Sequence, residues 1–141
     1  MVQENPGEGN DTIYASVNIT LPTNVENLFV YGGATSGSGN ALDNFIVNEF
    51  ITSGVTLTGG GGNDTFVFIP GTANNTTITD FFGNGAGVGD VLEFAAYGAG
   101  ASFAKTDATH GVVTYNGGAS HDTITFTNSP TIDIAHDVLF V

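Results

Sequence analysis

Residues 59–62 are four consecutive glycines, and they are followed by Asp64 and by an apolar segment that contains Phe66 and Phe68. Glycine adopts backbone angles that are closed to other residues, so such a run can turn several carbonyl oxygens toward one point. Ca²⁺ takes about six to eight oxygens from carboxylates, carbonyls and water. The pattern therefore predicts a calcium site, and a glycine-rich hairpin turn with a solvated aspartate is the alternative.

The same pattern occurs near the N-terminus, where Gly7, Gly9 and Asp11 fill the glycine and acidic places and Ile13 fills the apolar place. A degenerate copy follows, in which Asn44 takes the acidic place. An asparagine amide offers one oxygen and no charge, so this copy is expected to bind calcium weakly or not at all.

Two further aspartates, Asp80 and Asp90, flank a glycine-rich segment at residues 83–89. Because this segment can bend freely, both carboxylates are expected to reach one ion. The alternative is a strand, a loop and a second strand whose aspartates are solvated.

The elements that position these side chains are expected to be short strands. Residues 65–68 alternate polar and apolar, which predicts a strand with Phe66 and Phe68 inward and Val67 outward. The apolar residues Ile46, Leu57 and Phe66 are separated by eleven and then nine positions. Such an interval predicts stacked coils that bury a continuous apolar strip. With two nonapeptides per turn, Asp64 would lie between Asn44 and a position near Asp80.

The nonapeptide Gly-Gly-x-Gly-x-Asp-x-U-x, with U a large apolar residue, resembles the calcium-binding repeat of the RTX (repeats-in-toxin) family. Residues 78–94, with their Ile-x-Asp-Phe start, glycine loop and Asp-x-Leu end, are similar to the element that closes calcium rolls in that family. The resemblance implies an all-β, right-handed parallel β-roll over residues 6–94. The calcium ligands that it implies are Asp11 and Asp64 by side chain, Gly7, Gly9, Gly60 and Gly62 by carbonyl, and Asp80 and Asp90 in addition.

Residues 95–141 are expected to form an antiparallel β cap on the roll, within one domain that spans residues 1–141. Residues 111–115 and 122–126 alternate and are joined through Asn116-Gly117-Gly118, which is a hairpin signal. Residues 131–134 and 138–141 are predicted as final strands. The cap would cover a sheet edge that otherwise stays open.

Charge excludes several classes of partner. The chain carries a net charge of −13, with Lys105 as its only lysine or arginine. Nucleic acids and anionic membrane surfaces are bound through many such residues, so neither is an expected partner, whereas cations are. No apolar run is long enough to span a membrane. A hydrophobic content of 40% still predicts a folded core, and without cysteine no disulfide holds it.

No enzyme is expected. His110, His121 and His136 lack the spacing of a known zinc motif. In a strand, His121 and Asp122 would face opposite sides and form no dyad. The chain ends in Asp137 and four apolar residues, which is similar to the C-terminal signal of type I secreted RTX proteases, although a plain terminal strand gives the same letters.

The function expected from the resemblance is a secreted, extracellular calcium module that supports type I secretion and stability of a larger exported protein. The alternative is a calcium-dependent polysaccharide-binding accessory module of a carbohydrate-active enzyme or adhesin. An exposed line formed by Tyr14, Tyr31, Tyr97 and Tyr115 would favour the alternative, and buried tyrosines would favour the secretion module. Stacking of rolls end to end would give a homo-oligomer.

Overall fold

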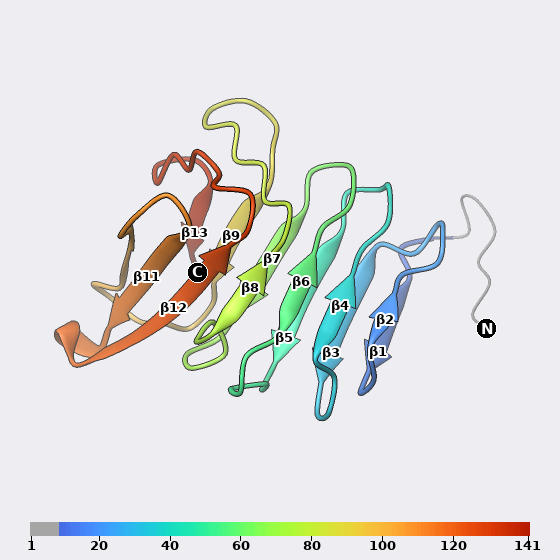
Figure 1. Cartoon of the computed structure of the whole chain (residues 1–141), viewed down its shortest axis with the longest axis horizontal. Helices are drawn as coiled ribbons and strands as arrows, with labels where there is room; N and C mark the ends of the chain where they lie inside the picture. The colour runs from blue at the N-terminus through green and yellow to red at the C-terminus, as the bar shows by residue number, and fades with distance from the viewer. Residues whose placement is uncertain (1–8) are drawn as a thin grey trace.

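A computed structural model describes residues 9–141 of the chain, which fold into two β-sheets (Figure 1). Alternation of polar and β-branched or aromatic residues between glycine-rich turns explains why the elements are short strands. The strands are β1 Thr12–Ala15, β2 Ile19–Thr20, β3 Asn27–Tyr31, β4 Ser36–Ser38, β5 Phe45–Glu49, β6 Thr56–Thr58, β7 Thr65–Phe68, β8 Thr76–Ile78, β9 Val91–Phe94, β10 Ser102–Lys105, β11 His110–Tyr115, β12 Ser120–Phe126 and β13 Val138–Phe140, with a 3₁₀ turn at Asn116–Gly118.

The first sheet is parallel throughout, and its six strands run in the order β1-β3-β5-β7-β9-β13. The second sheet has seven strands in the order β10-β11-β12-β8-β6-β4-β2. From β1 to β9 the chain passes from one sheet to the other at every strand, and each strand from β1 to β7 pairs in parallel with the strand two positions later. The prediction of an all-β chain with parallel pairing is therefore confirmed.

The core lies between the two sheets. Leu28, Ile46, Phe66 and Leu92 are register neighbours across β3, β5, β7 and β9, and all four are fully buried. Leu57 of the second sheet belongs to the same core cluster. The predicted inward set of Ile46, Leu57 and Phe66 is confirmed, and Val67 packs outside this cluster, as the alternation predicted.

The two sheets approach each other closely at Gly37 in β4. A Cβ atom there would lie 2.6 Å from Cγ1 of Val30 in the facing sheet, so a larger residue does not fit. Val17 is 67% exposed, because it lies in the bend between β1 and β2 rather than in a strand.

The C-terminal part is antiparallel only in part. Strands β10, β11 and β12 form an antiparallel meander, and the predicted hairpin at Asn116-Gly117-Gly118 is confirmed. However, β12 pairs in parallel with β8, so the second sheet is mixed, and β13 pairs in parallel with β9 in the first sheet. Residues 131–134 form no strand. The expected antiparallel cap is therefore present only in part, because β12 and the last strand pair in parallel with strands of the two sheets.

No helix among residues 9–141 is long and apolar enough to cross a membrane.

Candidate metal centre

Polar residues precede the strands of the parallel sheet, at the N-terminal ends of these strands, which lie uppermost in Figure 1. The residue immediately before each of β1, β3, β5, β7 and β9 is polar, and we call this set the strand-start column. Because the five strands pair in register, its members lie side by side in a row across the N-terminal ends of the strands. The column consists of Asp11, Glu26, Asn44, Asp64 and Asp90.

Backbone N–H groups of the column donate to side chains of the next coil. The N–H of Asp11 donates to Oε2 of Glu26 at 2.9 Å. The N–H of Asn44 donates to Oδ1 of Asp64 at 2.9 Å, and the N–H of Asp64 donates to Oδ1 of Asp90 at 2.8 Å. Each of these carboxylates therefore holds two neighbouring coils in register.

Asp64 folds back over its own glycine turn. Its side chain is buried, with the residue 2% exposed, and a Cβ atom on Gly59 would lie 2.2 Å from Oδ2. Within residues 9–141, Oδ2 accepts no hydrogen bond. Gly60 and Gly62 have φ angles of 103° and 96°, which side chains rarely allow. This turn therefore requires glycine for two reasons: its backbone angles are closed to other residues, and a side chain would not fit.

Asp80 and Asp90 approach the same turn from two directions. Oδ1 and Oδ2 of Asp80 accept from the N–H groups of Gly59 and Gly60, both at 2.9 Å. Oδ1 of Asp90 accepts from Asp64 and Oδ2 from the N–H of Phe82 at 2.8 Å. The structure brings Asp64, Asp80 and Asp90 to one turn of the fold. The register position after Asp64 belongs to Asp90, however, and not to Asp80, because the glycine segment 83–89 lengthens this coil.

The electrostatics of this turn are unfavourable without a cation. Burial raises the pKa of Asp64 to about 7, against the lowering effect of the Asn44 N–H, and the charges of Asp90 and Asp80 raise it further. Burial likewise raises the pKa of Asp90.

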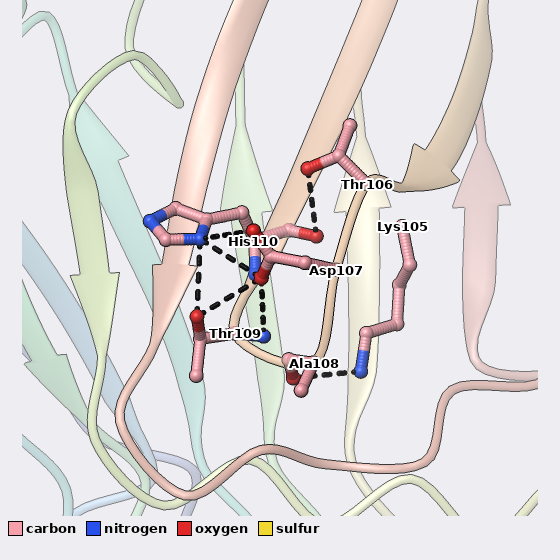
Figure 2. Close-up of polar contacts among 6 residues, drawn as sticks. All are labelled: Lys105, Thr106, Asp107, Ala108, Thr109 and His110. Carbon is pink, nitrogen blue, oxygen red and sulfur yellow. Dashed lines mark hydrogen bonds and ion pairs between the residues drawn. The ribbon is translucent and has the colours of Figure 1, made fainter.

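No lysine or arginine is close to these carboxylates. Lys105, the only lysine or arginine, donates to the carbonyls of Ala108 (Figure 2) and Pro130. Within residues 9–141, several buried carboxylates therefore form no ion pair with a basic side chain. They are Asp64, Asp90, Asp122 and Asp137.

The potential metal ligands around the turn are oxygen atoms, which suit a hard cation. Besides the carboxylates, the carbonyl oxygen of Gly59 and Oδ1 of Asn44 both lie against Gly39, where a Cβ atom would meet them at 2.2 and 2.3 Å. In the described range, no three Asp, Glu, His or Cys side chains lie close enough together to hold one ion. A calcium ion here would therefore take one or two carboxylates and complete its shell with carbonyls and water.

The N-terminal copy of the motif is described only in part. Gly7 lies outside residues 9–141, and Gly9 has a φ angle of 144°. Oδ2 of Asp11 is the one buried side-chain oxygen or nitrogen in the described range that has no hydrogen-bond partner. Asp11 thus keeps one carboxylate oxygen unused, as a ligand position would.

Two of the three histidines pair with aspartates three positions earlier, which was not predicted from the sequence. Nδ1 of His110 lies 2.9 Å from Oδ2 of Asp107 in the turn between β10 and β11, as Figure 2 shows. Nδ1 of His136 lies 2.9 Å from Oδ2 of Asp133. The N–H groups of Thr109 and His110 also donate to Asp107. The recurring Asp-x-x-His spacing was the available signal.

The four tyrosines divide into two pairs. Tyr97 and Tyr115 are buried, and both hydroxyls donate to the buried carboxylate of Asp122. Tyr14 is 61% and Tyr31 40% exposed, so no line of four exposed tyrosines exists. The role of Asp122 could not be read from the sequence, because its partners come from distant segments.

Comparisons of the chain with protein families, with curated proteins and with solved structures find no match.

Proposed function

We propose that this chain is a calcium-binding module of the RTX kind, in which a parallel β-roll folds when Ca²⁺ binds. The observation that carries the proposal is the turn at residues 59–62. There, buried Asp64 lies among Asp80 and Asp90, has a carboxylate oxygen without a hydrogen bond, and has no basic side chain to balance its charge. A divalent cation is the partner that this arrangement lacks.

The chain's own residues supply what a calcium ion needs in such a turn. Gly60 and Gly62 allow backbone angles that expose carbonyls, and Asp64 adds charge close to them. Bound calcium would neutralise the carboxylates. Without calcium, repulsion among Asp64, Asp80 and Asp90 opposes the stacking of coils, so metal binding and folding are coupled.

This coupling suits a protein that is exported before it folds. Extracellular calcium modules bind in a range of about 10⁻⁴ to 10⁻³ M, so the chain would stay unfolded where calcium is scarce. It would then pass the type I secretion machinery and fold outside the cell. We therefore propose that the module supports secretion and stability of a larger exported protein and performs no catalysis itself.

The polysaccharide-binding alternative has weaker support. Tyr97 and Tyr115 are buried against Asp122, so they are not free to stack on a sugar. The ring of Tyr14 stacks on Phe29 with the ring centroids 4.7 Å apart, which leaves only its other face open. Two exposed tyrosines on the outer face of the parallel sheet are a small platform for a polymer.

The test is a far-UV circular dichroism titration with calcium after chelation, with magnesium as the control ion. We expect a coil-to-β transition with calcium in the submillimolar to millimolar range and none with magnesium. If the β spectrum survives chelation, the protein is desalted and its calcium counted by elemental analysis. A folded protein with no bound calcium would refute the proposal.

A further inference from the structure

A second glycine loop faces a second pair of carboxylates, outside the nonapeptide repeats. A cavity of about 470 Å³ separates the loop after β8 from the segment that precedes β13. Gly83 and Gly85 line it on one side, and Thr131, Asp133 and Asp137 on the other. The lining therefore includes two carboxylates and no basic residue, and His136, which pairs with Asp133, lies outside it.

Asp137 is the buried member of this pair. The residue is 3% exposed, and its Oδ2 accepts from the N–H of Asp133 at 2.8 Å. Oδ1 accepts no hydrogen bond within residues 9–141. Unlike Oδ2 of Asp11, it is not sealed from solvent. Oδ1 of Asp137 is therefore accessible to solvent, and Asp137 lines the cavity.

The glycine loop passes close to these oxygens. A Cβ atom on Gly83 would lie 2.5 Å from Oδ2 of Asp137 and 2.6 Å from the carbonyl oxygen of Thr131. A Cβ atom on Gly85 would lie 3.2 Å from Oδ2 of Asp133. Only a loop without side chains at these positions can come so near.

We propose that this cavity is a separate divalent-cation site, with Asp133 and Asp137 as its carboxylate ligands and the Thr131 carbonyl as a third oxygen. Its donors are hard oxygens and its loop is adaptable, which favours Ca²⁺ over the smaller and geometrically stricter Mg²⁺. An ion there is held by the segment that precedes β13, so it fixes the last strand of the parallel sheet. The site shares no ligand with the turn at residues 59–62.

The matched pair of variants is Asp133→Asn and Asp107→Asn. Both aspartates are exposed, precede a histidine by three positions and bond its Nδ1, but only Asp133 lines the cavity. The number of bound calcium ions and their affinity are measured by isothermal titration calorimetry, and the number is checked by elemental analysis of the desalted full chain. We expect Asp133→Asn to lose one ion, or to bind it at least about tenfold more weakly, and Asp107→Asn to match the parent.

A second variant fills the site without removing a charge. In Gly83→Ala the new methyl group would occupy the space beside Asp137 and Thr131, so the same ion should be lost. An unchanged calcium count in both Asp133→Asn and Gly83→Ala would overturn the proposal. Asp64→Asn separates this proposal from that of the roll, because it should remove a different ion and leave the one that depends on Asp133.

Discussion

Two regions of the molecule bury carboxylates in different ways. At the glycine turn before β7, Asp64 accepts one hydrogen bond from a backbone N–H and has Asp80 and Asp90 as charged neighbours. At the opposite ends of the strands, Asp122 in β12 accepts from the N–H of Gly71 and the hydroxyl of Tyr97, both at 2.8 Å, and from the hydroxyl of Tyr115 at 3.3 Å. Both residues are 2% exposed.

The difference lies in what compensates the lost hydration. Neutral donors from three other segments of the chain satisfy both oxygens of Asp122, so this carboxylate needs no cation. Within residues 9–141, Asp64 has one oxygen without a hydrogen bond, and it faces like charge, so a bound cation would stabilise it. We infer that the C-terminal meander is held to the parallel sheet by hydrogen bonds, whereas the glycine turns would be held by the metal that we propose.

The largest expected effect comes from the region that needs no metal. Asp122→Ala leaves the N–H of Gly71 and the hydroxyl of Tyr115 without partners in a buried site. We expect it to lower the free energy of unfolding by about 3 kcal/mol, equally with calcium and with chelator. Urea denaturation under both conditions measures this, with sucrose in both samples so that the metal-free chain is folded. The exposed variant Asp107→Ala is the control, and a loss seen only with calcium would break the comparison.

Asp64→Asn should act with opposite sign in the two conditions. With calcium present, it removes a charged ligand, and we expect the calcium midpoint to rise about tenfold, which corresponds to about 1.4 kcal/mol. With chelator, it relieves repulsion by Asp80 and Asp90, so the metal-free protein should become slightly more stable. A calcium titration gives the midpoint, and thermal melts in chelator with sucrose added to fold the metal-free chain give its stability. Destabilisation of equal size in both would mean that Asp64 is only a hydrogen-bond acceptor.

Local patterns predicted the strands and their buried faces. Phe66 and Phe68 lie inward because the alternation of residues 65–68 fits a strand with one face in the core. The hairpin at Asn116-Gly117 was predictable because both residues adopt positive φ angles in the turn, at 53° and 65°. These features depend on neighbouring residues, and the sequence shows neighbours directly.

The pairings between distant segments could not be predicted. The parallel pairing of β13 with β9 joins residues more than 40 positions apart, and no local signal specifies it. The length of the coil that contains residues 83–89 decided that Asp90, and not Asp80, follows Asp64 in the strand-start column. For the same reason the sequence showed Asp137 only as part of a C-terminal signal, and not as a neighbour of Gly83.

The smallest effect is the pH dependence of the metal-free protein. Because the folded state raises the pKa of Asp64 from 3.8 to about 7, its protonated form favours folding. That stability is complete below about pH 4 and is lost as the pH rises through 7. We expect the free energy of unfolding in chelator, with sucrose added to fold the metal-free chain, to fall by about 1 kcal/mol from pH 5 to pH 8, and the slope to be smaller in Asp64→Asn, in which Asp90 keeps its raised pKa. Asp107 and Asp133, whose pKa values are lowered, act only below pH 4 and leave this window clear. A rise in stability over the same range would contradict the assignment of Asp64 as the uncompensated carboxylate.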